Sequence, residues 1–367
     1  MNELLSLFPV LFLVYALQCI AAAPPDAAVF ILDSRLRGRP LRYSWLVGRS
    51  QYRLFLLNPF FPLSCAVYAG GHPFSFLASS AGEIRGVNFT AAGSIDPGLT
   101  FDQPHRFSSR FKQLLVDDSP VATFHSEHIA AHLATFLDKL QSASPRKRSA
   151  FLDRELRKMF ALDKLRERLQ LLSRRTVLLN SLCFSLFLFL FLLAPATIYM
   201  FGLRRLWPGL LLALVLFSLL ILWTFRRARR RLYPQGKNDD LQHLLTIALS
   251  PFAAIRALDP LAADLLEDFH PVAVACALLP EKHFLQFAEK ELRRIKFITH
   301  DAILERAITA FLSGQKFDPQ SLLQPPAPAD GRSRTYCPAC LTQYVIEEGV
   351  CDDCGGAALL PLPPVNS

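Results

Sequence analysis

The sequence predicts an integral membrane protein of the α+β class, with three transmembrane helices and several lobes outside the membrane. Two long apolar runs stand back to back near the middle of the chain, and a third opens it. The remainder alternates strand-like and helix-like segments. With 367 residues, 51% of them hydrophobic, and a mean hydropathy of +0.26, the chain is too apolar for an ordinary soluble enzyme and too polar for a polytopic transporter.

The central runs predict a transmembrane hairpin at 176–225. They cover Thr176–Phe201 and Leu206–Thr224, and only Gly202 to Arg205 separates them. Each run reaches the roughly 20 residues that a helix needs to cross about 30 Å of hydrocarbon, where a lone segment satisfies its backbone only as a helix. Because the linker is so short, both ends of the hairpin should emerge on the same side of the membrane.

The first apolar run, within 1–23, predicts an N-terminal transmembrane helix, with a cleaved signal peptide as the alternative. A signal peptide begins with a basic stretch, whereas this chain begins Met1-Asn2-Glu3. Arginines at 35, 37, 39 and 42 follow the run and favour a cytoplasmic location for that side. We therefore expect a multi-pass protein with its N-terminus outside and its main lobes and C-terminus in the cytoplasm.

The net charge of +9 concentrates beside the apolar runs, above all in the arginine-rich segment 226–231. Positive charge at the ends of spans is typical of cytoplasmic flanks, and it also attracts anionic lipid headgroups. The lipid bilayer is therefore the first predicted partner. Binding of nucleic acid by the same basic side chains is a weaker alternative, because topology already explains the charge.

The segment 24–142 predicts a β-rich cytoplasmic lobe that ends in a helix at His125–Leu140. Short apolar stretches separated by Gly, Pro and Asn are typical of strands in a small β domain. These stretches are Ala28–Leu32, Tyr43–Val47, Tyr52–Leu57, Cys65–Tyr68, Phe74–Leu77 and Gly86–Phe89.

A charged amphipathic helix is predicted at 150–175, leading into the hairpin. Apolar residues recur along it three or four residues apart, namely leucines at 152, 156, 162, 165, 169 and 172 together with Met159. Two such stripes can pair as a short coiled coil, which would make the chain self-associate. Because the run covers only about three heptads, packing on the chain's own lobe is the favoured interpretation.

Residues 239–315 predict a helical bundle, followed by a flexible Pro-rich tether at 316–335. Three side chains are predicted to cap helices of this bundle: Ser250, Asp259 and Thr299. The helix predicted at Pro280–Phe297 should bury one apolar face. Its charged residues are expected to face water, namely Glu289, Lys290, Arg293 and Arg294.

The tail holds two Cys-x-x-Cys pairs, Cys337/Cys340 and Cys351/Cys354, separated by ten residues. Two such pairs can bring four thiolates into a tetrahedron around Zn²⁺, whose size and softness suit them. Two disulfides or a rubredoxin-like iron are the alternatives, and the reducing cytosol implied by the hairpin topology favours zinc. Because four protein ligands leave no open coordination position, the predicted site is structural.

Around these cysteines, residues 336–364 resemble the C4 zinc-ribbon family. The matching elements are a Cys-Pro-x-Cys knuckle, the Gln343-Tyr344 pair, a Cys-x-x-Cys knuckle followed by Gly355, and a Leu/Pro tail from Leu359. The resemblance implies a ribbon fold and a structural zinc ion, and it names no reaction. One departure is Leu341, because many ribbons have glycine directly after the first knuckle.

Histidines in the 24–142 lobe support a membrane-tethered enzyme as an alternative. They are His72, His105 and the cluster His125–His132, in which His128 and His132 stand one helical turn apart. That spacing suits metal ligands, but no third ligand accompanies it. The chain has no Gly-rich phosphate loop and no Gly-x-Ser-x-Gly motif. Catalytic residues are therefore unassigned, and no organic cofactor is predicted.

Together these features predict a membrane-anchored, non-catalytic scaffold or adaptor that presents cytoplasmic lobes and a zinc ribbon to a protein partner. The prediction depends on the closed metal site, the tether and the lack of a recognisable catalytic set. An enzyme with its site in 24–142 is one alternative, and a membrane-bound nucleic-acid binder is the other. The sequence identifies neither the partner nor a substrate.

Overall fold

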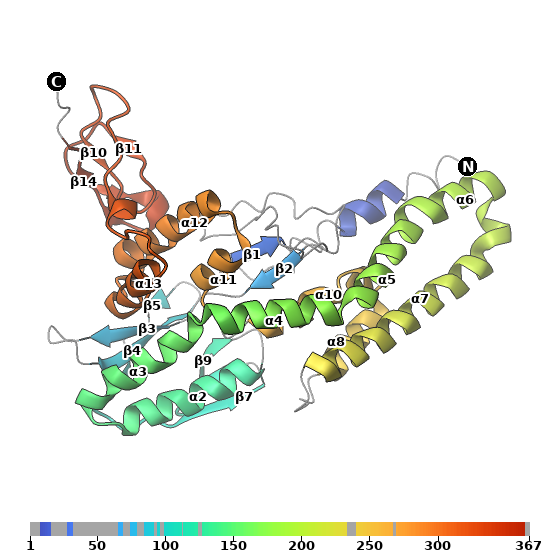
Figure 1. The fold of residues 1–367 in the computed structure, drawn as a ribbon, viewed down its shortest axis with the longest axis horizontal. Helices are drawn as coiled ribbons and strands as arrows, with labels where there is room; N and C mark the ends of the chain where they lie inside the picture. Colours follow the sequence, from blue (N-terminus) through green and yellow to red (C-terminus); the bar gives the residue numbers. More distant parts are fainter. Residues whose placement is uncertain are drawn as a thin grey trace. The chain divides into compact units, whose positions relative to one another are not determined.

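The computed structural model describes most of the chain. The described residues are 8–15, 28–31, 65–68, 74–78, 84–91, 94–95, 99–111, 113–123, 127–232, 240–266 and 269–363. The chain forms two compact units, whose helices and strands are labelled in Figure 1. Unit 1 comprises 1–70, 162–267 and 277–279, and unit 2 comprises 71–161, 268–276 and 280–367.

Unit 1 combines one strand pair with a set of helices. Its strands, β1 (Ala28–Ile31) and β2 (Cys65–Tyr68), pair antiparallel and coincide with two of the predicted strands. The predicted strands at 43–47 and 52–57 lie outside the described residues. The helical elements are α4 (Leu162–Arg175), α5 (Val177–Leu188), η1 (Phe189–Leu193), α6 (Ala194–Phe201), α7 (Leu203–Leu232), α8 (Asp240–Leu249), α9 (Pro251–Ile255) and α10 (Leu258–Leu266).

The two central apolar runs form a pair of long helices, as predicted. The first is continuous from Val177 to Phe201 through α5, η1 and α6, and the second is α7. Gly202 joins them with a φ of 78°, a conformation that glycine adopts at little cost. Both helices are long and apolar enough to cross a membrane. Of the third span predicted at 1–23, the structure describes only residues 8–15, which are helical.

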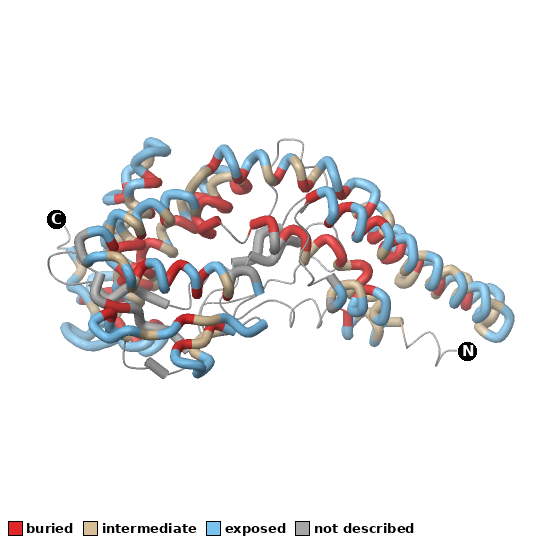
Figure 2. The backbone as a smooth tube through the Cα atoms, turned by 90° about the horizontal axis from the view of Figure 1, so that it is seen from below, coloured by how far each residue is buried: buried red, intermediate tan, exposed pale blue. Residues whose placement is uncertain are grey.

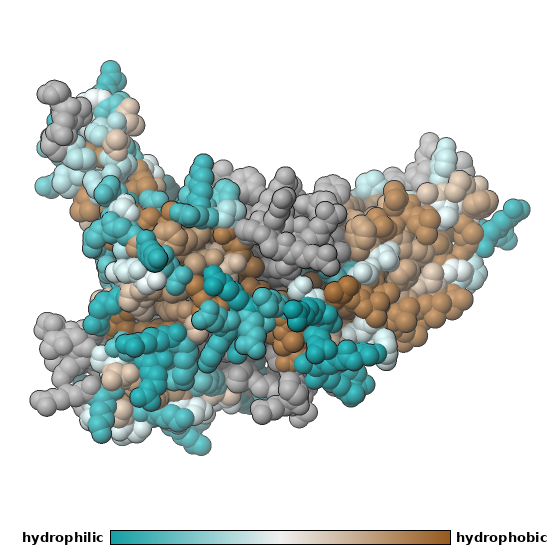
Figure 3. All heavy atoms as spheres, in the orientation of Figure 1, coloured by the Kyte–Doolittle hydropathy of each residue, from teal (hydrophilic) through white to brown (hydrophobic). Residues whose placement is uncertain are grey.

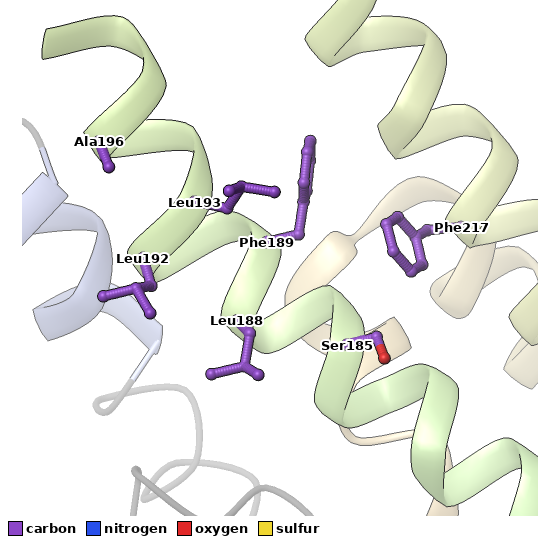
Figure 4. Close-up of a pocket in the computed structure, with 7 residues that line it drawn as sticks. All are labelled: Ser185, Leu188, Phe189, Leu192, Leu193, Ala196 and Phe217. Atoms are coloured by element: carbon purple, nitrogen blue, oxygen red, sulfur yellow. The ribbon is translucent and has the colours of Figure 1, made fainter. Parts of the chain in front are cut away.

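A π-helical turn, η1, widens the first of these helices. Pro195 follows in the first turn of α6. It lacks an N–H and its ring crowds the carbonyl group of Phe191, which accounts for the wide turn. An apolar groove of about 620 Å³ lies beside it (Figure 4), lined by Ser185, Leu188, Phe189, Leu192, Leu193, Ala196 and Phe217. The rings of Phe189 and Phe217, from the two helices, have their centroids 5.5 Å apart.

The surface of α7 is apolar and largely exposed. No residue of α7 is buried between Leu203 and Leu220, whereas its last turns include buried residues such as Phe225 and Ala228. Figure 2 shows the hairpin mostly exposed or half-buried toward its turn, and Figure 3 shows hydrophobic residues gathered over the hairpin. The exposed side chains include Leu211, Leu212, Val215, Leu216, Leu219, Leu220 and Trp223. On a soluble protein, a continuous apolar patch of this size marks a contact with a membrane or another protein. Near the end of the helix the guanidinium of Arg227 lies 5.3 Å from the Trp223 ring centroid.

The single helix predicted at 150–175 is two helices. α3 (Pro145–Met159) belongs to unit 2 and ends at Phe160, and α4 belongs to unit 1. The helix stops because the carbonyl oxygen of Met159 accepts a hydrogen bond from the backbone N–H of His270, 3.0 Å away, while the Phe160 ring stacks on the His270 ring. All six leucines of the predicted stripe are buried within the chain.

Outside the C-terminal residues 335–361, the described part of unit 2 contains two small sheets and several helices. One sheet contains β3 (Phe74–Ala78), β4 (Ile84–Ala91), β5 (Ser94–Ile95) and β6 (Leu99–Thr100), and the other is the meander of β7 (Phe107–Arg110), β8 (Gln113–Val116) and β9 (Ser119–Thr123). Its helical elements include α2 (Glu127–Ser142), α3, most of α11 (Pro271–Leu278), α12 (Glu281–Arg294), η2 (Ile295–Thr299), α13 (Ala302–Gly314) and η3 (Ser321–Leu323). Strands β3 and β4 and helix α2 coincide with predicted elements.

The helical bundle predicted at 239–315 is divided between the units. Helices α8 to α10 belong to unit 1, and α12 and α13 belong to unit 2. Ser250 caps α9 as predicted, with its hydroxyl accepting a backbone hydrogen bond. Asp259 lies inside α10 instead of capping it. Because η2 extends through Thr299, Asp301 rather than Thr299 caps α13.

Candidate metal centre

The C-terminal module is built from short strands and two cysteine knuckles. Strand β10 (Thr335–Tyr336) pairs with β11 (Gln343–Tyr344) on one side and with β14 (Leu360–Pro361) on the other, and β12 (Val350–Cys351) pairs with β13 (Ala357–Ala358). The first knuckle directly follows β10, and the second begins in β12. These three strand pairings thus place both cysteine pairs at one point of the module.

The four cysteine side chains converge. The sulfur atoms of Cys337, Cys340, Cys351 and Cys354 all lie within 4.8 Å of one another. Those of Cys340 and Cys351 are 3.8 Å apart, well beyond the roughly 2.05 Å of a disulfide bond. Two Zn–S bonds of about 2.3 Å at a tetrahedral angle separate their sulfur atoms by about 3.8 Å. The cluster therefore has the size and the ligand set to hold a metal ion such as zinc.

Two residues with left-handed backbones shape the knuckles. Leu341 follows the first cysteine pair with a φ of 66°, and Gly355 follows the second with a φ of 69°. The backbone N–H of Leu341 donates to the carbonyl oxygen of Cys337 (2.8 Å), and that of Gly356 donates to Cys351 (3.0 Å). A leucine in this conformation costs roughly 1–2 kcal/mol. The departure from the ribbon pattern at Leu341 thus adds strain without disturbing the four sulfur atoms.

Hydrogen bonds and burial make the thiols unequal. The Tyr344 hydroxyl donates to the sulfur of Cys351 (3.2 Å), and the Thr342 hydroxyl lies 3.2 Å from the sulfur of Cys340. Burial acts to raise the pKa of Cys340, but hydrogen bonds with Thr342, Cys337 and Cys354 together outweigh it and lower that pKa. Burial raises the pKa of Cys337 to about 11. A metal ion must displace protons from such thiols, so its binding is pH-dependent.

The cysteines are also the core of the module. The buried residues of this core are Cys337, Ala339, Cys351, Cys354 and Ala357, with Cys340, Tyr344, Leu359 and Phe297 packed against them. A core this small rarely supports a fold of under about 40 residues without a metal or disulfides. All four cysteines are free thiols. The small core and the convergent thiols are therefore compatible with a metal ion held at the cluster.

A buried arginine attaches the module to α12. The sequence pattern placed Arg293 in water, but this residue is only 2% exposed. Its guanidinium donates to the carbonyl oxygens of Pro338 (3.1 Å) in the first knuckle and Gln324 (2.7 Å), and to the Glu289 carboxylate (3.1 Å). The spacing of Glu289 and Arg293 is typical of exposed helix pairs, which is why the sequence pattern predicts an exposed Arg293. Phe297, one turn beyond, packs on the cysteine cluster.

The Pro-rich segment predicted as a flexible tether is held at several points. The side chain of Gln343 accepts from the backbone N–H of Ala329 (2.8 Å) and donates to the carbonyl oxygen of Ala327 (2.7 Å). Arg293 holds the carbonyl oxygen of Gln324 in the same segment. These bonds link the segment to β11 and α12, so the ribbon is an attached part of unit 2.

Two of the candidate histidines can be assessed. His105 pairs its Nδ1 atom with the Asp117 carboxylate at 2.8 Å. Gln141 of α2 joins the His105 backbone through two hydrogen bonds of 2.9 Å, so His105 links α2 to the start of β7. His132 is exposed on α2. His72, His125 and the side chain of His128 lie outside the described residues.

Comparisons with protein-family models, with curated proteins and with solved structures find no match for this chain. Its function is therefore inferred from two features of the described residues, the cysteine cluster and the pair of long apolar helices. A metal held by four thiolates has no coordination position left for a substrate or a water molecule. Such a centre supports a structural role.

Proposed function

We propose that this chain is a membrane-anchored, non-catalytic scaffold or adaptor whose zinc ribbon docks a protein partner at the cytoplasmic face. In this proposal the hairpin crosses the bilayer, and Cys337, Cys340, Cys351 and Cys354 hold one structural Zn²⁺. The observation that carries the docking role is an exposed apolar cluster at the tip of the ribbon, formed by Val345, Ile346 and Val350.

Length, surface and charge support the membrane anchor. α7 has 30 residues, so it extends about 45 Å, enough to cross the hydrocarbon and reach water. Arginines flank the open end of the hairpin, two before α5 and five at the end of α7, against two at the turn. The side with more basic residues is the cytoplasmic one by the positive-inside rule. The ribbon follows from that end, so in this proposal it lies in the cytoplasm.

The ribbon tip has the character of a protein-docking surface. Val345, Ile346 and Val350 are exposed between β11 and β12, with the exposed carboxylates of Glu347 and Glu348 between them. An apolar centre with a charged rim is typical of protein–protein contacts. The carboxylates repel a phosphate backbone, which argues against nucleic acid at this surface. The partner that fits is a protein surface with an apolar centre and a basic rim.

The metal and the tip are structurally coupled. Val350 directly precedes the ligand Cys351, and the hydroxyl of Thr335 in β10 donates to the carbonyl oxygen of Ile346 at 2.7 Å. Both flanks of the tip are thus built on strands that the cysteines hold together. Loss of the metal should therefore remove the docking surface as well.

The test is crosslinked capture of partners by the full-length protein in its native membrane. The double substitution Val345→Ser and Ile346→Ser should reduce the partners captured by the wild type at least about tenfold, because burying each aliphatic side chain contributes about 1.5–3 kcal/mol. Zinc content should stay at one per chain in this variant. Phe111→Ser, which removes an exposed apolar side chain outside the ribbon, should leave capture unchanged. An unchanged partner set in the double variant would contradict the docking role.

A further inference from the structure

Helix α8 carries an apolar stripe that the described residues of unit 1 leave exposed. Leu241, Leu245 and Leu249 are 66%, 50% and 83% exposed and recur every four residues, so they share one face. Ile247, on the opposite face, is buried. Sequence reasoning assigned α8 to a soluble bundle, where such a stripe would face inward. What surrounds this stripe depends on how far along the axis of the first span α8 and α9 lie.

Contacts between α9 and the first span show how far along that axis α9 lies. The thiol of Cys183 donates to the carbonyl oxygen of Ala254 at 3.2 Å. The ring of Phe252 stacks on that of Phe191, with the centroids 6.2 Å apart. Cys183 and Phe191 lie eight and sixteen residues beyond Arg175, about 12 and 24 Å along the helix axis. The start of α9 is therefore level with the apolar interior of the first span.

The turn between α8 and α9 satisfies part of its own backbone. The N–H of Ser250 donates to Thr246 (3.0 Å), and the carbonyl oxygen of Ser250 accepts from Ala254 (2.9 Å). The Ser250 hydroxyl accepts from the N–H of Ala253 (3.3 Å), and Pro251 has no N–H to satisfy. In hydrocarbon an unpaired backbone group costs several kcal/mol. This turn is thus suited to a position inside a membrane.

The charges around the turn are also accommodated. Within 241–255 there is no acidic, lysine or arginine side chain. The first ones beyond the turn, Arg256 and Asp259, form an ion pair with each other. A charged pair near hydrocarbon is tolerated when its members neutralise each other. Asp240 at the start of α8 lies about 15 Å from the turn, the length of the ten-residue helix.

We propose that α8 and α9 form a re-entrant element that enters the membrane from the arginine-rich end of the hairpin and turns back at Ser250-Pro251. The stripe Leu241–Leu245–Leu249 then contacts lipid acyl chains. α8 packs along α7 and α9 (Figure 1), so its stripe extends the exposed apolar surface of α7. This proposal rests on the membrane insertion of the hairpin and adds a third membrane-embedded layer to it.

The test is site-specific photocrosslinking to lipid in the full-length protein, reconstituted in phosphatidylcholine nanodiscs with all cysteines intact. A benzophenone amino acid replaces one residue at a time, and mass spectrometry counts covalent lipid adducts. Leu219 on the exposed face of α7 is the positive reference, and Ser313, exposed on α13, is the aqueous reference. We expect adducts at 245 and 249 within about threefold of those at 219, and none at 313.

The outcomes separate the re-entrant element from the hairpin. Lipid adducts at 219 without any at 245 and 249 would overturn the re-entrant element and leave the hairpin in place. Crosslinks from 245 to a second copy of the chain would overturn it too, since a protein would then cover the stripe. Absence of lipid adducts at 219 as well would overturn both. A size-exclusion profile and a zinc content equal to those of the wild type show that each labelled protein is folded.

Discussion

In the proposed function, the hairpin is stabilised by a bilayer and the ribbon by a metal ion, and the two kinds of support are distributed differently over the residues. Exposed apolar side chains cover α7, so a bilayer would stabilise the hairpin through many small, separate contacts. The ribbon has a core of three buried cysteines and two alanines, so its stability depends on one centre. This difference predicts where a single substitution lowers stability. A residue lost from the hairpin should be compensated by its neighbours, whereas a ligand lost from the ribbon should not.

The largest expected effect tests this contrast directly. Cys351→Ser should remove the metal and unfold the ribbon, because structural zinc sites of this kind contribute about 10–16 kcal/mol of binding free energy. Leu216→Ala, on the exposed face of α7, should change stability by less than about 1 kcal/mol. Metal analysis under anaerobic conditions should find one zinc per chain in the wild type and in Leu216→Ala, and none in Cys351→Ser.

Limited proteolysis provides the control for that comparison. Cleavage within 320–363 should accelerate in Cys351→Ser, while the hairpin stays protected in membranes. Iron in place of zinc in the wild type would correct the identity of the metal. The expected difference between Cys351→Ser and Leu216→Ala would still hold. A full equivalent of metal retained by Cys351→Ser would instead show that the ribbon does not depend on its four ligands together.

The sequence predicted what local patterns determine. The length of the two apolar runs and the short linker were enough for the hairpin, and the Cys-x-x-Cys spacing was enough to bring four sulfur atoms together. Long-range contacts account for the differences. The helix predicted at 150–175 is interrupted because Met159 bonds to His270, more than a hundred residues away. The pattern around Arg293 is that of a surface helix, and only the folded ribbon reveals the carbonyl groups that bury it.

A smaller loss of stability is expected where the ribbon is attached to α12. Arg293→Met should weaken this attachment by about 3 kcal/mol, since it leaves the buried carbonyl oxygens of Pro338 and Gln324 without their charged donor. Hydrogen exchange at 324–340 should accelerate while the zinc content stays at one, because the ligands are untouched. Arg294→Met is the matched control.

Arg294 is one residue further along the same helix and pairs with Glu291 near the surface. A part-buried pair three residues apart on one helix contributes about 0.5 kcal/mol, and neither member contacts the ribbon carbonyl groups that Arg293 holds, so Arg294→Met should leave exchange at 324–340 almost unchanged. Equal effects of the two substitutions would show that the charge of α12, and not the attachment of Arg293, stabilises the ribbon. Loss of zinc in Arg293→Met would show that the arginine supports the metal site itself.

The smallest effect concerns Asp301, which caps α13 by accepting the N–H groups of Ile303 (3.1 Å) and Leu304 (2.9 Å). Burial raises the pKa of Asp301 above its usual 3.8, against the opposing effect of these N–H groups. The folded state therefore binds the proton more tightly than the unfolded state. The stability that this group contributes is present below about pH 3.8 and is lost as the pH rises through the folded pKa.

Two variants separate the cap from the charge of Asp301. Asp301→Ala should lower the free energy of local opening of α13 by about 1 kcal/mol, because it removes the cap. Asp301→Asn keeps the cap and does not titrate, so its stability relative to the wild type should improve as the pH rises from about 4 to 7. Hydrogen exchange of the first-turn amides of α13, measured across that range, follows both effects. The same pH dependence in Asp301→Asn and wild type would assign the titration to another group and leave the cap as the only role of Asp301.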